Sequence, residues 1–245
     1  MLENYKERFR TRGKYIFVPN DRCKRKGKRI IEFFNKRMDF PDYYYHYKKG
    51  GHVAALHGHL NNRLFFKIDI QNFYYSIARM RVTRALRSWG YPGAGTLAKW
   101  SCVANPIAAH PRHVLPIGFV QSPLLASLVL MKSPVTGAIE RAIANGVTIS
   151  VYLDDFVGSH SDEAVLLAAY TDIRDTCASS ELVPNAAKLT PPAAAISAFN
   201  CDLSYGRAEV TPDRINRYLA STDRTVQSDA AFAQYVSRIS ARNVL

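Results

Sequence analysis

The hydrophobic positions in the middle of the chain form two short runs around a pair of acidic residues. The segment VTISVYLDDFVGS at 147–159 is rich in β-branched and aromatic residues, which is typical of two β-strands. Together the runs predict a hairpin with Asp154 and Asp155 near its tip. Neighbouring carboxylates repel each other, so a divalent cation would stabilise the pair. The alternative is a solvated acidic turn, and the pair alone does not decide between the two.

The rest of the hydrophobic pattern predicts a mixture of strands and helices. In LFFKIDI at 64–70 apolar residues recur with period two, which places Asp69 at the end of a strand, on the face opposite to Ile68 and Ile70. Short strands are also predicted at 195–199 and over 203–210, where the chain turns at Gly206. Helices are predicted at 52–60, 80–89, 124–131, 163–180, 213–219 and 230–242, and a further helix reaches residue 144. Strands and helices do not alternate regularly, so we expect an α+β fold.

The N-terminal segment combines a short apolar run with dense positive charge. Residues 15–18 predict a strand, 20–28 a loop and 29–33 a returning strand, while residues 1–14 are expected to be a short helix or an arm. Five of the seven residues at 22–28 are Lys or Arg. We therefore expect a hairpin with a basic tip that binds phosphate groups, with a solvated basic turn as the alternative.

Composition narrows the choice of partners. The 245 residues include 33 Lys and Arg and 20 Asp and Glu, a formal net charge of +13, which favours a polyanion such as nucleic acid. No run of about 18 apolar residues occurs and the first residues do not resemble a secretory signal, so we expect a cytoplasmic protein without membrane contact. The four cysteines form no CxxC pair, which argues against a zinc site or a disulfide framework.

Asp69 and the pair Asp154 and Asp155 are far apart in sequence, but all three fall at predicted strand ends. Three carboxylates from neighbouring strands of one sheet can hold two Mg²⁺ ions about 4 Å apart, with Mn²⁺ as an alternative. Two such ions activate an attacking hydroxyl and stabilise a leaving pyrophosphate in phosphoryl transfer. The basic charge of the chain fits a nucleotide and a nucleic-acid substrate.

Five short motifs follow one another along the chain. They are GKRII at 27–31, FKIDIQNFYYSI at 66–77, LPIGFVQSP at 115–123, YLDD at 152–155 and LVPNAAK at 182–188. In this order they resemble the GKxRxI element, the first-aspartate motif, the LPxGxxxSP loop, the YxDD motif and the Asn-x-x-Lys motif of the reverse transcriptases. The form of the motifs is similar to that of the bacterial members, which occur in retrons, group II introns and defence or abortive-infection systems. The resemblance covers roughly residues 15–200.

The resemblance implies a right-hand polymerase fold with an antiparallel palm sheet backed by helices. Its implied domains are fingers at 1–63, a palm at 64–200 with an interleaved fingers segment at about 78–114, and the end of the palm with a small helical thumb at 201–245. Asp69, Asp154 and Asp155 would be the catalytic metal ligands, together with the backbone carbonyl of Ile70.

The resemblance also implies a nucleotide-binding set. Its members are Lys24, Lys26, Arg29, Tyr74, Gln121, Ser122 and Lys188. Tyr74 would be the bulky gate that excludes a ribose 2′-hydroxyl, and Lys188 would lie near the pyrophosphate. The chain departs from the pattern at Ile117, where many relatives have Gln, and after Phe199, where roughly 45 residues allow only a small thumb.

On this basis we expect an RNA-directed DNA polymerase that acts in antiphage defence. It would copy an RNA template, in one version a dedicated non-coding RNA, into a DNA product from dNTPs. Two alternatives stay open: a retron-type or template-independent enzyme, and a catalytically silent palm that binds RNA or assembles with partners. A small thumb would hold duplex weakly, so we expect a structured RNA, a second copy of the chain or an accessory protein to help retain the product.

Overall fold

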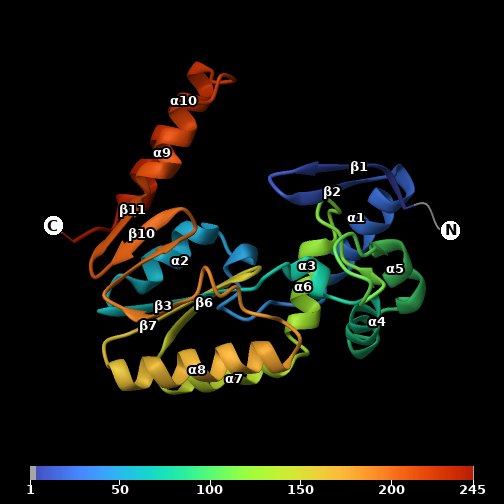
Figure 1. The fold of residues 1–245 in the computed structure, drawn as a ribbon, viewed down its shortest axis with the longest axis horizontal. Helices are drawn as coiled ribbons and strands as arrows, with labels where there is room; N and C mark the ends of the chain where they lie inside the picture. Colours follow the sequence, from blue (N-terminus) through green and yellow to red (C-terminus); the bar gives the residue numbers. More distant parts are fainter. Residues whose placement is uncertain (1–3, 245) are drawn as a thin grey trace. The chain divides into compact units, whose positions relative to one another are not determined.

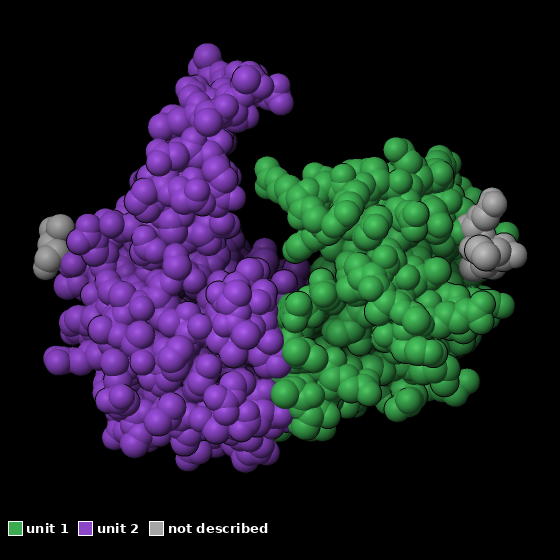
Figure 2. Space-filling view, viewed as in Figure 1, with its two compact units in different colours: residues 1–40, 70–137, 177–183 green, residues 41–69, 138–176, 184–245 purple. Residues whose placement is uncertain are grey.

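The computed structural model describes residues 4–244, and the chain divides into two compact units (Figure 2). Unit 1 consists of residues 1–40, 70–137 and 177–183, and unit 2 consists of residues 41–69, 138–176 and 184–245. Each unit therefore combines segments that are far apart in the sequence.

Unit 1 begins with an antiparallel hairpin. Strands β1 (Tyr5–Thr11) and β2 (Lys14–Pro19) are joined by a tight turn in which Arg12 and Gly13 both have positive φ. The prediction of a helix or an arm before residue 15 is therefore wrong over residues 5–11, and residues 1–3 lie outside the described part of the chain. The predicted strand at 15–18 is confirmed as β2.

The basic segment after β2 is a helix, and the prediction of a basic hairpin tip with a returning strand at 29–33 is wrong. Helix α1 (Asp21–Asn35) buries Cys23, Gly27, Ile30 and Phe34 at helical spacing, so its Lys and Arg residues fall on the remaining faces. The side chain of Asn20 caps the helix by accepting from the Cys23 backbone N–H at 2.8 Å. The sequence pattern did not reveal this helix, because Lys and Arg residues separate its buried positions.

The remainder of unit 1 is mainly helical. Its elements are α3 (Phe73–Ser76), α4 (Arg79–Ser88), α5 (Ala94–Ser101), the short antiparallel strands β4 (Val103–Ala104) and β5 (His113–Val114), α6 (Ser122–Leu130) and the start of α7 (Pro134–Ala144). Helix α6 is buried nearly all round, as its apolar sequence predicts. Among the described residues no single helix meets the length and composition needed to cross a membrane, although α6 and α7, bent by 70°, meet them as a pair.

The core of unit 2 is a four-stranded antiparallel sheet in the order β6-β7-β3-β8. The strands are β3 (Leu64–Asp69), β6 (Thr148–Tyr152), β7 (Asp155–His160) and β8 (Thr190–Ala193). Figure 1 shows α2 (Gly51–His59) on one side of this sheet and α8 (Glu163–Ser179) on the other. Phe65 packs with α2, whereas the ring of Phe66 contacts Tyr170 of α8. The predicted hairpin at 147–159 and the predicted strand at 64–70 are both confirmed.

A second sheet and two helices complete unit 2. Strands β9 (Ala195–Ala198), β10 (Cys201–Ser204) and β11 (Arg207–Val210) form an antiparallel sheet in the order β11-β10-β9. Helices α9 (Pro212–Leu219) and α10 (Val226–Ser240) follow, and Ile239 of α10 packs into the core that α2 shares with this sheet. The α+β class predicted from sequence is confirmed. All four cysteines are buried and free.

Candidate active site

The acidic pair lies where β6 turns into β7. Asp155 is the first residue of β7 and pairs with Tyr152, so Leu153 and Asp154 form a two-residue turn, and Leu153 takes a positive φ of 59°. The Leu153 backbone N–H donates to Nδ1 of His46 at 3.3 Å. Burial lowers the pKa of His46 to about 4, so its ring is neutral and able to accept this bond near pH 7. The strained turn is therefore held from outside the hairpin.

The register of the sheet brings two of the carboxylates face to face. Asp69, the last residue of β3, is paired directly with Asp155 across the strands. Like charges in such a position destabilise a sheet unless other groups balance them. Asp69 is only 4% exposed and accepts from Lys188 Nζ at 2.9 Å and from Asn185 Nδ2 at 3.2 Å. The bond to Asp69 raises the pKa of Lys188, so its ammonium stays charged and balances Asp69.

Asp155 is less well satisfied than Asp69. Its Oδ1 atom is buried and makes no hydrogen bond within the described part of the chain, although Lys67 Nζ lies 3.4 Å away as an ion pair. The pKa of Asp155 is raised to about 6, mainly by burial and also by repulsion from Asp154 and Asp69, and Lys67 opposes this rise. A buried carboxylate oxygen without a hydrogen-bond donor is a position that a cation would stabilise.

The carboxylate oxygens of Asp69 and Asp155, called here the acidic corner, are of the kind that bind a divalent metal ion. Mg²⁺ binds through one or two carboxylates and completes its shell with water and substrate phosphate oxygens. Asp69 and Asp155 are such a pair, and the Oδ1 atom of Asp155 makes no hydrogen bond with the described residues. Within residues 4–244 no three His, Cys, Asp or Glu side chains lie close enough to surround one ion. If an ion is bound here, these two carboxylates would form part of its coordination shell, and water and a phosphate-bearing substrate would complete it.

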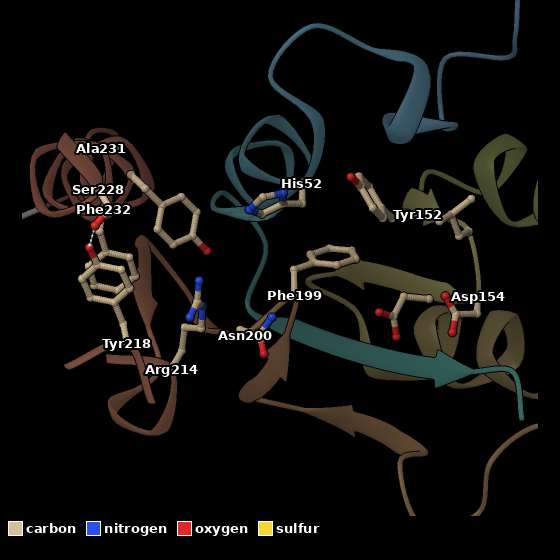
Figure 3. Close-up of a pocket in the computed structure, with 13 residues that line it drawn as sticks. His52, Tyr152, Asp154, Phe199, Asn200, Arg214, Tyr218, Ser228, Ala231 and Phe232 are labelled. Carbon is tan, nitrogen blue, oxygen red and sulfur yellow. Dashed lines mark hydrogen bonds between the residues drawn. The ribbon is translucent and has the colours of Figure 1, made fainter. Parts of the chain in front are cut away.

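The acidic corner opens into a cavity of about 620 Å³ within unit 2 (Figure 3). Its walls come from the β6–β7 turn, α2, the β9–β10 turn, α9 and α10, and carry many rings: His52, Tyr152, Phe199, Tyr218, Phe232 and Tyr235. These rings form a continuous series, because Tyr152 lies 5.7 Å from Phe199 and His52 lies 5.7 Å from Tyr235 between ring centroids. The series ends at Tyr218 and Phe232, which are stacked at 3.9 Å.

Sequence reasoning missed several residues of this site. Lys67 is two positions before Asp69 on β3, so the period of the strand already placed both on one face. Phe199 and Asn200 occupy the β9–β10 turn with positive φ, and both line the cavity. No local pattern links that turn to the acidic hairpin, so the sequence carried no comparable signal for Phe199.

The predicted nucleotide-binding residues other than Lys188 belong to unit 1. Lys26 and Arg29 of α1 together line a cavity of about 330 Å³, whose lining does not include Lys24. Tyr74 lies in α3 and is half-buried. Ile70, the other predicted metal contact in this unit, directly follows Asp69 in the chain and is buried.

Gln121 and Ser122 are both buried and contact the protein itself. The Ser122 hydroxyl donates to the Pro116 carbonyl at 2.7 Å, and Gln121 Nε2 donates to Ser101 Oγ at 3.3 Å. The Gln121 Oε1 atom is buried without a hydrogen-bond donor among the described residues. These contacts fix the shape of the 115–123 loop. Direct binding of a nucleotide by Gln121 or Ser122 stays a prediction.

Comparison with known proteins gives the chain a family. The family model described as reverse transcriptase (RNA-dependent DNA polymerase) matches residues 10–192. No curated protein matches. Among solved structures, a foamy viral protease–reverse transcriptase in complex with double-stranded DNA is 15% identical, with a TM-score of 0.51, over 91% of this chain and 33% of that chain. Telomerase from Candida albicans, in complex with a fragment of telomeric RNA, is 8% identical, with a TM-score of 0.47, over 75% of this chain and 36% of that one.

The chain thus spans about a third of the length of each of these two proteins. At 15% identity the foamy viral likeness shows the fold alone, which is that of a right-hand polymerase. The family model, in contrast, extends over most of the chain and includes Asp69, Asp154, Asp155 and Lys188. The chain belongs to the reverse transcriptase (RNA-dependent DNA polymerase) family.

Proposed function

We propose that the protein is an RNA-directed DNA polymerase, which adds dNTPs to a primer on an RNA template. The observation that carries this proposal is the direct pairing of Asp69 with Asp155 at the mouth of an aromatic cavity, in a chain of the reverse transcriptase family. The aromatic cavity, the placement of Lys188 and the positive net charge support the same activity.

The residues that would hold two Mg²⁺ ions, or Mn²⁺, are Asp69, Asp154, Asp155 and the carbonyl of Ile70. When bound, the ions would supply Lewis-acid activation of the attacking hydroxyl and charge stabilisation of the leaving pyrophosphate. The chain's own cations have separate tasks. Asp69 holds the Lys188 side chain, which is about half exposed, so that its ammonium can contact a phosphate oxygen, and Lys67 limits repulsion around Asp155.

The aromatic cavity is suited to the end of a nucleic acid beside the carboxylates. Bases stack on aromatic rings with little dependence on sequence, at about 1–3 kcal/mol per base. Phe199 and Tyr152 present such rings within the lining that also contains Asp154 and Asp155. Arg214 adds a cation to the same wall, and the net charge of +13 supports binding to a phosphate backbone.

The finer assignments rest on the form of the motifs. We propose that the protein is a bacterial, defence-associated member of the family that copies a dedicated non-coding RNA. The proposed domains are those expected from sequence: fingers at 1–63, a palm at 64–200 with an interleaved fingers segment at about 78–114, and the end of the palm with a small thumb at 201–245. Since α9 and α10 supply only 8 and 15 residues, the proposed thumb is short, and a structured RNA, an accessory protein or a second copy would help to retain the duplex.

Primer extension with purified protein tests the activity and separates its alternatives. The reactions contain Mg²⁺, dNTPs and a DNA primer on an RNA template, and parallel reactions omit the template or the primer. Extension that requires the RNA template supports the proposal. Extension without a template supports template-independent synthesis instead, and RNA binding without any synthesis supports a silent palm. Sequencing of the copurified nucleic acid then identifies the template, and a mixture of unrelated cellular RNAs would contradict a dedicated one.

A further inference from the structure

A second cavity, of about 690 Å³, lies within unit 1 and is rich in positive charge. Arg81 and Arg84 of α4 and Lys132, just beyond α6, line it, and Glu181 is the one acidic residue in the described lining. The other polar groups are serine hydroxyls, of which those of Ser88 and Ser133 donate to backbone carbonyls of their own helices or turns, whereas the Ser180 hydroxyl makes no such bond among the described residues. Arginine, lysine and hydroxyl groups are the side chains that bind phosphate oxygens.

One of the three cations already has a structural task. The Arg81 guanidinium donates to the Ser180 carbonyl at 2.9 Å, at the C-terminal end of α8. A cation at that position stabilises the carbonyl end of a helix, so Arg81 is explained without a ligand. Partial burial lowers the pKa of Arg81, Glu181 raises it, and Arg84 lowers it further, so Arg81 and Arg84 repel each other.

Arg84 and Lys132 are not balanced by a carboxylate. Among residues 4–244 neither forms an ion pair. The ammonium of Lys132 lies 4.2 Å from the centroid of the Trp89 ring, a contact that leaves its positive charge in place. If Glu181 balances Arg81, the cavity keeps about two uncompensated positive charges. An anion that entered it would relieve the repulsion between the two arginines.

A buried hydroxyl in the same lining also has no partner. The Ser180 Oγ atom is inaccessible to solvent and makes no hydrogen bond with the described residues. Buried polar atoms are nearly always paired, so an orphaned hydroxyl beside a cationic cavity indicates an acceptor that binds there. This observation is independent of the charge and points to the same class of ligand.

We propose that this cavity of unit 1 binds phosphate groups of an RNA backbone through Arg84, Lys132 and Ser180. None of the described lining residues is aromatic, so nothing offers a stacking surface for a nucleobase. The site would therefore recognise backbone phosphates and not a free nucleotide. The choice of RNA as the source of the phosphates rests on the proposed function, whereas the phosphate chemistry rests on the cavity alone.

The first test measures binding of a fluorescent RNA hairpin at several salt concentrations in the absence of dNTPs. The variant is Arg84→Glu with Lys132→Glu, and the matched control is Arg87→Glu with Lys99→Glu, two exposed cations of unit 1 that do not line the cavity. We expect the variant to bind about 10-fold more weakly, with a slope of log affinity against log salt reduced by about 2. The control should stay within about twofold of the wild type. Equal losses in both variants, or none in the first, would overturn the proposal.

A second variant removes a hydroxyl without changing charge. Ser180→Ala breaks no hydrogen bond that Oγ makes within the described residues, so the melting temperature should be unchanged while RNA affinity falls about threefold. Unchanged RNA affinity would contradict a role for this hydroxyl. This variant also keeps the test valid if the charge reversals affect folding.

Two further measurements identify the source of the phosphate and separate this inference from the polymerase proposal. Calorimetry should show that inorganic phosphate and ATP bind this cavity much more weakly than the RNA hairpin does. Tight ATP binding that depends on Arg84 and Lys132, together with an RNA affinity that is unchanged in the Arg84→Glu, Lys132→Glu variant, would overturn the choice of RNA. RNA binding is measured without dNTPs, so the result does not depend on DNA synthesis. A wild-type protein that binds RNA through this cavity but extends no primer would refute the proposed function and leave this inference standing, and the reverse pattern would refute only this inference.

Discussion

Replacing His59 tests how the hairpin that carries Asp154 and Asp155 is held. His59 lies on α2 and is 1% exposed; its Nδ1 pairs with Ser159 Oγ at 2.7 Å and its Nε2 with Ser150 Oγ at 2.9 Å. One serine lies on β6 and the other on β7, so a single imidazole links both strands of the hairpin to the helix. We expect His59→Gln to weaken this link and to change the pH dependence of stability.

The magnitude follows from the pKa of the buried ring. Burial lowers the pKa of His59 from 6.5 to about 3. The folded state therefore binds fewer protons than the unfolded state between these values, so its stability is greatest above pH 6.5 and falls as the pH drops toward 3. Between pH 7 and pH 5 this single group should cost about 2 kcal/mol of unfolding free energy.

The assay is urea denaturation at 25 °C, followed by circular dichroism at pH 5, 6 and 7. At pH 7 the variant should lose about 1–3 kcal/mol, because the buried Ser150 and Ser159 hydroxyls each lose the hydrogen bond to the imidazole, and within the described chain only Ser159 keeps a bond from Asn62 Nδ2. Its stability should then fall by about 2 kcal/mol less than that of the wild type between pH 7 and pH 5. Ser159→Ala is the control, because it keeps the titrating ring and should retain the full pH dependence. Equal pH dependence in His59→Gln and wild type would refute the account of this network.

Three further outcomes are expected. Gly118→Ala should lower the free energy of unfolding by at least about 2 kcal/mol in thermal or urea denaturation, because Gly118 has a φ of 106° and a Cβ there would overlap the Phe17 carbonyl oxygen. In the control Gly95→Ala, in α5, the new Cβ meets no neighbour, so stability should be unchanged or higher by about 0.5 kcal/mol. Equal effects of the two substitutions would contradict this difference. Tyr74→Ala should raise incorporation of ribonucleotides relative to deoxyribonucleotides by about 10-fold or more in single-nucleotide extension, if its ring is the 2′-hydroxyl gate. Lys188→Ala should lower the rate of single-nucleotide addition by about 100-fold and should also lower the melting temperature, because the buried Asp69 loses the cation that balances it; a rate near that of the wild type would exclude a role in phosphate stabilisation.

Local patterns in the sequence were sufficient for the acidic hairpin and for β3. Both segments alternate over short distances, and the strand period alone placed Asp69 at an end and on a defined face. The same kind of pattern failed for α1, where Lys and Arg occupy most positions between Cys23, Gly27, Ile30 and Phe34. A close helical approach to Gln121 explains why Gly27 lies within this stripe, since a Cβ at that position would overlap the Gln121 side chain.

The sequence was sufficient to predict several residues of the site, but not how these residues are arranged in space. The period of β3 gives the face of Asp69, but only the register of β3 against β7 gives its pairing with Asp155, and register is set by packing of the whole sheet. The aromatic cavity depends on α2, the β9–β10 turn and α10 meeting in three dimensions. His52, Phe199 and Tyr235 are distant in sequence and have no shared local pattern, so no sequence window could have grouped them.

The most direct test of the central claim is metal-dependent primer extension by Asp155→Asn. Because the pKa of Asp155 is raised by burial, its charged form is costly in the fold, and a neutral isostere should leave the melting temperature equal or higher. The matched control is Asp175→Asn, which removes an exposed carboxylate of α8. We expect Asp155→Asn to bind RNA template and primer as the wild type does but to extend the primer at least about 1,000-fold more slowly, while the control is fully active. Extension by Asp155→Asn within about 10-fold of the wild type would contradict the assignment of this carboxylate pair as the catalytic site.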